Sequence, residues 1–126
     1  MLITKSNEVN MSLDLTTLNS YRDFMGEDAD SFIEDIIRSY LNDAPKLLET
    51  LKETISSGDS ARFVRSAHTL KSNSATLGAA ELAAIAAELE QAGKSTPLPA
   101  LTEKVQAAGE ELKKVLEALR EYLNGN

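Results

Sequence analysis

The sequence contains no cysteine, no tryptophan and a single histidine among its 126 residues. Without cysteine the chain has neither a disulfide framework nor a thiolate metal site, and this composition is compatible with a reducing compartment. No apolar run approaches the ~20 residues that cross a bilayer, and the first residues lack the apolar core of a secretory signal. We therefore expect a soluble cytoplasmic protein that does not associate with membranes.

Basic side chains are also scarce. Thirteen Lys and Arg residues oppose twenty Asp and Glu residues, for a net charge of −7. Such a chain offers no basic stripe for the phosphates of a nucleic acid, so we expect no nucleic-acid binding. With 126 residues and 42% hydrophobic content, the chain can bury a core without disulfides. We expect a flexible lead-in over 1–12 and one domain over 13–124.

Strand-like alternation is missing, and helical periodicity runs through the chain. Glycines, prolines and capping residues set the expected helix boundaries. The predicted helices cover about Leu13–Met25, Asp28–Ser57 with a kink at Pro45, Asp59–Leu77, Ala80–Ala92, and a last helix that follows Pro97 and Pro99 and ends near Leu123. This order predicts an all-α fold, an antiparallel four-helix bundle with an additional short N-terminal helix.

The last predicted helix carries an apolar row whose spacing alternates between four and three residues. Its members are Leu101, Val105, Ala108, Leu112, Val115, Leu119 and Tyr122. Such a row serves either as the seam of a dimeric coiled coil or as one member of an antiparallel bundle. The short loops and three other amphipathic helices favour the bundle, so we expect a monomer, with a dimer through this helix as the alternative.

The single histidine, His68, lies about 120° from the centre of the core face of its predicted helix, at roughly 100° per residue. That core face comprises Phe63, Val64, Ala67, Leu70, Ser74 and Leu77. The ring is therefore expected at the boundary or exposed. Arg65 and Lys71, three residues away on either side, would stabilise an anion on the imidazole. The remaining neighbours are small and would let a second protein approach closely: Ala61, Ser72 and Ala75.

An exposed imidazole flanked by cations fits few reactions. A metal site needs further ligands, and a catalytic histidine needs a nucleophile or carboxylate arranged around it; the sequence indicates neither. A phosphoryl acceptor needs only a nucleophilic ring, nearby cations and a docking surface. The alternative interpretation is an ordinary solvent-exposed histidine without a function.

The segment Ala67–Ala79 resembles the signature of histidine-containing phosphotransfer (Hpt) domains. That signature has a His, an apolar residue two positions on, a Lys three positions on, then small residues, and a Gly ten positions on. The resemblance extends to Asp43-Ala44-Pro45, to Ser57-Gly58-Asp59 and to the helix order, over about 13–123. It implies a four-helix bundle with an extra N-terminal helix that relays phosphoryl groups between receiver-domain aspartates.

The resemblance also implies roles for individual residues. His68 would be the phosphoacceptor, Lys71 would help to hold the phosphoryl group, and Gly78 would let the chain turn after the helix. The family commonly has Gly directly after the Lys, where this chain has Ser72. Serine is still small, so we expect docking to survive, with Ser72, Ala75 and Ala61 on the receiver-docking surface.

The following helix also departs from the family pattern. Some members place a Gln there to support the His, and in this register the chain has Glu90, with Gln91 adjacent. A carboxylate could accept a hydrogen bond from the ring, but it would also repel phosphate. Lys94, one turn further, could supply compensating charge.

We expect neutral His68 to attack an aspartyl phosphate on a docked receiver domain, which would supply Mg²⁺, so this chain itself needs no cofactor. No ATP-binding element is visible, which predicts a relay component rather than an enzyme. The expected partners are response-regulator receiver domains and a hybrid histidine kinase, docked on exposed residues of 15–25 and the start of the next two helices. The alternatives are a phosphorylation-independent adaptor bundle and a fragment of a larger kinase.

Overall fold

The computed structural model describes residues 12–125, which contain five α-helices, two 3₁₀ turns and no strand. In chain order the elements are α2 (Leu15–Met25), η1 (Gly26–Asp28), α3 (Ala29–Ser57), α4 (Ser60–Thr76), α5 (Ala80–Gly93), η2 (Leu98–Leu101) and α6 (Thr102–Gly125). Apart from Ser12, the expected lead-in lies outside the described residues. None of the described helices is both long enough and apolar enough to cross a bilayer.

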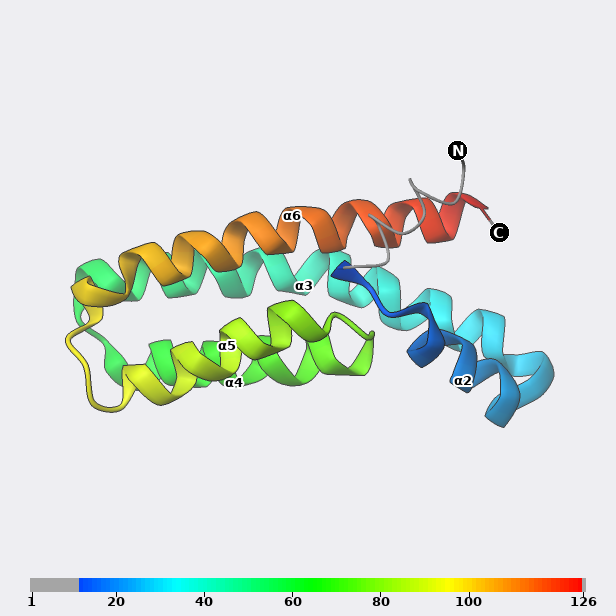
Figure 1. The fold of residues 1–126 in the computed structure, drawn as a ribbon, viewed down its shortest axis with the longest axis horizontal. Helices are drawn as coiled ribbons and strands as arrows, with labels where there is room; N and C mark the ends of the chain where they lie inside the picture. The colour runs from blue at the N-terminus through cyan, green and yellow to red at the C-terminus, as the bar shows by residue number, and fades with distance from the viewer. Residues whose placement is uncertain (1–11, 126) are drawn as a thin grey trace.

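Four of the helices form an antiparallel bundle. Helix α3 packs on α4 and α6, and α5 packs on the same two helices from the other side, so each bundle helix has two neighbours (Figure 1). The predicted all-α class and the antiparallel four-helix bundle are therefore confirmed.

Each bundle helix buries a row of residues at spacings of three and four, which is the pattern of one apolar helix face. The row of α3 includes Ile33, Ile37, Tyr40, Ala44, Leu48 and Leu51, and that of α6 includes Val105, Ala108, Leu112, Val115 and Leu119. The α6 row is the one that also suggested a coiled-coil dimer. Because it packs within its own chain, it forms part of the bundle core.

As predicted, α3 continues past Pro45 as one helix. The predicted N-cap of α4 is also confirmed, because Asp59 Oδ1 accepts a hydrogen bond from the Arg62 backbone N–H at 3.1 Å. Some boundaries were wrong by a residue: α4 ends at Thr76 rather than Leu77, and α5 ends at Gly93. The 3₁₀ turn η2, which precedes α6, was not predicted.

Helix α2 begins two residues later than expected, because Asp14 is its N-cap. The Thr16 backbone N–H donates to Asp14 Oδ1 at 3.0 Å, which satisfies one of the free donors at the helix start. Leu13 therefore lies before the helix, yet it is fully buried. The chain is packed against the bundle before α2 begins.

The position of α2 follows from the unequal lengths of the bundle helices. Helix α3 has 29 residues and α4 has 17, or about 44 Å and 26 Å at 1.5 Å per residue. The first turns of α3 therefore extend beyond α4, and α2 lies alongside them (Figure 1). Leu18 of α2 is buried there, and Arg22 bridges Asp30 of α3 and the Tyr122 hydroxyl of α6.

Gly78 joins α4 to α5 and also contacts the segment before α2. Its φ of +85° is a left-handed conformation that favours glycine. Its carbonyl accepts the Asp14 backbone N–H at 2.8 Å, and a Cβ at this position would lie 2.5 Å from the Asp14 carbonyl oxygen. The Tyr21 hydroxyl donates to the Thr76 carbonyl at 3.0 Å. The expected turn thus lies at Gly78, and it also anchors the N-terminal segment to the end of α4.

Candidate functional site

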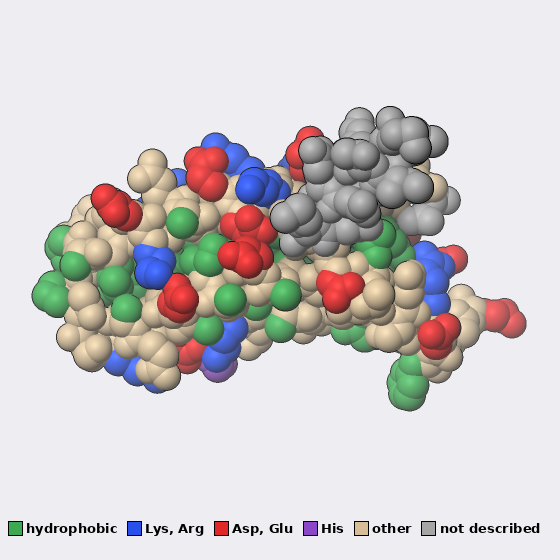
Figure 2. All heavy atoms as spheres, in the orientation of Figure 1, with side chains coloured by type: hydrophobic (Ala, Val, Ile, Leu, Met, Phe, Trp, Pro, Cys, Tyr) green, Lys and Arg blue, Asp and Glu red, His purple; other side chains and the backbone are tan. Residues whose placement is uncertain are grey.

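His68 lies in the middle of α4 on the side that faces away from the core. The buried residues of this helix are Phe63, Ala67, Leu70 and Ser74, and the His68 side chain is 56% exposed. This exposure agrees with the expectation from the helical wheel. The histidine, purple in Figure 2, lies at the edge of the molecule beside Lys and Arg side chains.

The rotation of α4 about its own axis is held by a buried hydrogen bond to α3. The Tyr40 hydroxyl and Ser74 Oγ lie 2.7 Å apart in the core, and burial raises the pKa of Tyr40 to about 12. Ser74 is six residues after His68 and points about 120° away from it around the helix. A bond that holds Ser74 inward therefore also holds the imidazole outward. The sequence analysis placed Ser74 on the core face of its helix but did not pair it with Tyr40.

Glu90 of α5 reaches the imidazole. Its Oε2 lies 2.9 Å from His68 Nδ1, and its side chain is only 15% exposed. Hydrogen bonds from Lys71 and then from His68 lower the pKa of Glu90, so the group is a carboxylate that can only accept. In this contact Nδ1 therefore carries the proton, and in the neutral ring Nε2 holds the free lone pair.

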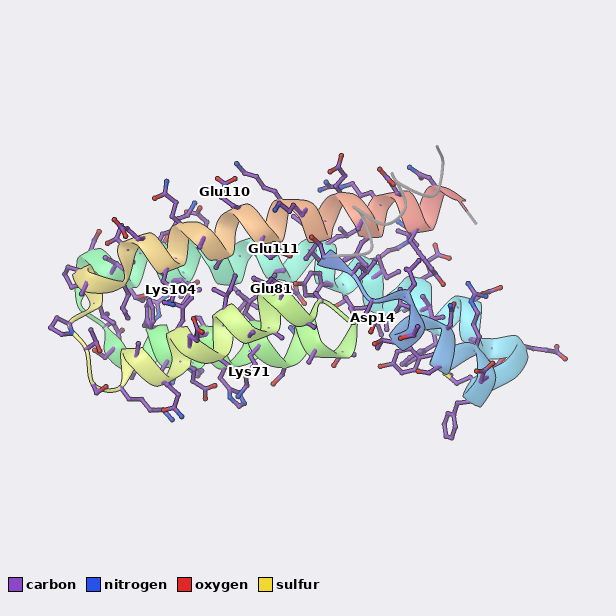
Figure 3. The ribbon with its side chains drawn as sticks, viewed as in Figure 1. Asp14, Lys71, Glu81, Lys104, Glu110 and Glu111 are labelled. Atoms are coloured by element: carbon purple, nitrogen blue, oxygen red, sulfur yellow. The ribbon has the colours of Figure 1, made fainter. Side chains whose placement is uncertain are left out.

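Lys71 binds the second oxygen of the same carboxylate. Its Nζ lies 2.8 Å from Glu90 Oε1, and its side chain is 35% exposed. Glu90 thus bridges the imidazole and the ammonium group, and the charge of Lys71 offsets that of the carboxylate. Figure 3 shows Lys71 on the outer side of the α4–α5 pair, away from α6 and its Glu110 and Glu111. The sequence analysis identified all three residues, but it did not predict the ion pair.

The close approach of α4 and α5 brings these groups together. A Cβ added at Gly93, near the end of α5, would lie 2.8 Å from Phe63 Cδ1 and 3.1 Å from Val64 Cγ2. A larger residue would therefore push the helices apart one turn from Glu90. The sequence analysis did not identify this role of Gly93 in packing.

Two predicted site residues on α5 do not reach the imidazole. Gln91 is exposed and faces a shallow recess that it shares with Glu88 and Ser95, with no hydrogen bond to His68. Lys94 is also exposed, and it lies near Ala61 and Val64 at the start of α4 rather than at Glu90. Of the α5 candidates, only Glu90 touches the ring.

The remaining candidates surround His68 on α4. Ser72 and Ala75 are exposed towards the C-terminal end of the helix, and Ala61 is exposed towards its N-terminal end. Arg65 is exposed as well, and no carboxylate oxygen lies within ion-pair distance of its guanidinium among residues 12–125. In the same part of the chain, no cluster of three His, Asp or Glu side chains could hold a metal ion.

The comparisons with known proteins agree with this geometry. The model of one protein family, described as the Hpt domain, matches residues 35–122, more than two thirds of the chain. A search of curated proteins found no match.

Two solved structures share the fold. The crystal structure of histidine-containing phosphotransfer protein B (HptB) from Pseudomonas aeruginosa PAO1 is 21% identical, with a TM-score of 0.79 over 91% of this chain and 96% of that one. The Hpt domain of a sensor hybrid histidine kinase from Shewanella is 22% identical, with a TM-score of 0.76 over the same shares of the two chains. At these identities the likeness concerns the fold, and it includes the region before residue 35.

Proposed function

The chain belongs to the Hpt domain family, and on that basis we propose that His68 is the residue on which it carries the phosphoryl group. Hpt domains are phosphotransfer carriers in phosphorelays, where they interact with receiver domains and histidine kinases. The hydrogen bond from His68 Nδ1 to Glu90 is the observation that carries the proposal. In the neutral form of this exposed ring it leaves Nε2 without a proton, and therefore nucleophilic.

The chemical step needs no proton transfer within this chain. The lone pair of His68 Nε2 attacks the phosphorus of an aspartyl phosphate, and the bond from phosphorus to the aspartyl oxygen breaks. Its electron pair leaves with the aspartate as a carboxylate. The ring gains a positive charge, while the proton stays on Nδ1 and remains hydrogen-bonded to Glu90. Transfer to a second aspartate reverses these steps, with the receiver domain supplying Mg²⁺ on each occasion.

Glu90 and Lys71 prepare the ring for this reaction. Glu90 orients the imidazole and stabilises the positive charge that develops on it during attack, as a carboxylate does for the histidine of other catalytic sites. A bare carboxylate would also repel the incoming phosphoryl group. Lys71 offsets that repulsion, because its ammonium lies 2.8 Å from the same carboxylate.

The docking surface that we propose extends from His68 towards α2. Phe24 of α2 is 89% exposed, which is unusual for a large apolar side chain. Nearby, the rings of Tyr21 and Phe32 meet edge to face with centroids 5.3 Å apart, and both are only partly buried. A groove lined by Ile36 and Thr76 continues from there onto α4. A receiver domain that covers this path would place its aspartate over His68.

We further propose that the chain is a monomeric carrier without kinase activity of its own, and that it works in the cytoplasm. A monomer is supported by α6, whose apolar row is buried against its own bundle. The proposed reaction takes its phosphoryl group from a partner, so this chain needs neither ATP nor a bound metal.

A transfer assay tests the assignment. The purified chain would be mixed with receiver domains that carry labelled aspartyl phosphate and Mg²⁺, with His68→Gln as the control. We expect acid-labile, base-stable label on the wild type only, and ³¹P–¹⁵N coupling at Nε2. Label on the His68→Gln variant, or coupling at Nδ1, would contradict the proposal.

A further inference from the structure

The start of α4 and the end of α5 enclose an open recess of about 480 Å³, on the same side of α4 as His68. Ala61, Val64 and Gly93 contribute small or half-buried surface, while Ser60, Thr96 and Lys94 supply polar groups. Beside the recess, α4 and α5 pack closely at Gly93. It plays no part in the transfer chemistry described above.

The recess lies within reach of any partner that docks on His68. Ala61 precedes His68 by seven residues, or two helical turns, which is about 10 Å along the axis. A protein interface of ordinary size covers about 800 Å² on each partner, and a disc of that area has a radius of about 16 Å. A footprint centred on His68 therefore includes the recess.

Two cations stand at or near the recess. Lys94, which directly follows α5, lines it, and Arg65 lies one helical turn along α4 from Ala61, another lining residue. Neither Lys94 nor Arg65 has a carboxylate oxygen within 4.0 Å among residues 12–125. The acidic residue closest to Arg65 in sequence, Asp59, accepts the Arg62 backbone N–H as the cap of α4. The one closest to Lys94, Glu90, is bound by His68 and Lys71. The positive charge here is therefore not neutralised by an ion pair.

The distribution of charge along the molecule makes this end distinctive. The whole chain has a net charge of −7, and the turn between α2 and α3 at the other end is acidic, with Asp23, Glu27 and Asp28 exposed. Lys71 is also near His68, but Glu90 binds it. An anionic protein surface would therefore be drawn to the recess end and repelled from the α2 end.

We propose that the recess receives an acidic segment of the receiver partner, and that Lys94 and Arg65 select the partner by charge. A carboxylate side chain entering over Ala61 meets an ammonium, a guanidinium and hydroxyl groups, with no bulky side chain in its way. A neutral or basic segment would leave both cations desolvated and unpaired. This inference rests on the proposed function, and it assigns Arg65 to docking rather than to the phosphoryl group.

The test compares charge reversals at two places on the molecule. Transfer from a labelled receiver would be followed for the wild type, Lys94→Glu, Arg65→Glu and the control Arg120→Glu. Arg120 is exposed at the opposite end of the bundle, on α6, and lacks an ion pair among the described residues. All three variants change the net charge equally, so Arg120→Glu accounts for the overall charge.

At low ionic strength we expect Lys94→Glu and Arg65→Glu to lower the second-order transfer rate constant about tenfold. The rate at saturating receiver should not change, the difference should shrink with added salt, and Arg120→Glu should have little effect. Equal slowing in all three variants, or no slowing, would overturn the inference. A lower transfer rate at saturating receiver for Arg65→Glu would mean that Arg65 acts on the phosphoryl group, and this would also overturn the inference. If the wild type takes no label, the proposed function itself fails.

Discussion

Replacing Gly78 with alanine should destabilise the protein far more than the same replacement at Gly58. Both glycines have a left-handed backbone, with φ of +85° and +78°, and alanine in that conformation costs about 1–2 kcal/mol. The two sites differ in their surroundings. A Cβ at Gly58 would have no heavy atom within 4 Å, whereas one at Gly78 would lie 2.5 Å from the Asp14 carbonyl oxygen.

The additional cost at Gly78 can be estimated from these contacts. Relieving such an overlap typically costs 1–3 kcal/mol. Moving the two segments apart also weakens the hydrogen bond between the Asp14 N–H and the Gly78 carbonyl, worth roughly 1 kcal/mol. We therefore expect a loss of about 3–6 kcal/mol for Gly78→Ala and about 1–2 kcal/mol for Gly58→Ala.

Urea unfolding followed by far-ultraviolet circular dichroism measures both losses, with Gly58→Ala as the matched control for backbone strain. Equal losses in the two variants would refute the argument, because they would mean that the contact with Asp14 contributes nothing. A small loss for Gly78→Ala would also show that the N-terminal segment does not hold to the bundle through this turn.

Glu90→Gln should lower the rate of transfer to His68 roughly ten- to a hundredfold, because the amide supplies no charge to hold the Nδ1 proton. ¹⁵N spectra of the imidazole in this variant should show a mixture of tautomers. A ring protonated purely at Nδ1 would contradict the prediction. Lys71 and His68 lower the pKa of Glu90, so its contribution to stability is present above the usual glutamate range and is lost as the pH falls through the lowered pKa. The free energies of unfolding of the wild type and Glu90→Gln should therefore depend differently on pH in that acidic range. Identical pH dependence in the two proteins would contradict this prediction. Burial raises the pKa of Tyr40 from 10.0 to about 12, so its contribution is complete below pH ~10 and is lost as the pH rises towards 12, by roughly 2–3 kcal/mol; unfolding experiments should show that Tyr40→Phe lacks this alkaline loss. Phe24→Ala should raise the Kd for a receiver about tenfold, as the loss of a large aromatic side chain from an interface does. The free energy of unfolding should not change, because the ring is 89% exposed. Unchanged affinity would show that the docking surface does not include this part of α2.

The geometry of the site depends on contacts of α4 that do not touch the imidazole. The Tyr40–Ser74 hydrogen bond sets the rotation of α4 against α3, and the contact of Gly93 with Phe63 and Val64 sets the distance from α4 to α5. A shift in either would move His68 relative to Glu90. These residues are part of the core, yet they position the reacting group.

Much of the fold could be predicted from the sequence, since helix formation and capping are local. Helical periodicity identified the buried row of α6 and the core face of α4, and Asp59 was recognised as the start of α4 from its residue type and position. The exposure of His68 followed from the same periodicity. The start of α2 was wrong because Leu13, although apolar, precedes the capping residue Asp14 and packs on the bundle outside the helix.

The sequence by itself determined which residues belong to each helix face. It therefore also determined that the single imidazole faces solvent with Lys71 beside it. Tertiary structure decided which groups on the neighbouring helix meet that imidazole. Glu90 and Gln91 are adjacent, but successive residues point about 100° apart on a helix. Only the rotation and spacing of α5 against α4 could turn Glu90 towards both His68 and Lys71 and leave Gln91 facing away. Those quantities depend on packing between distant segments, at Gly93 and Ser74, which no local pattern encodes.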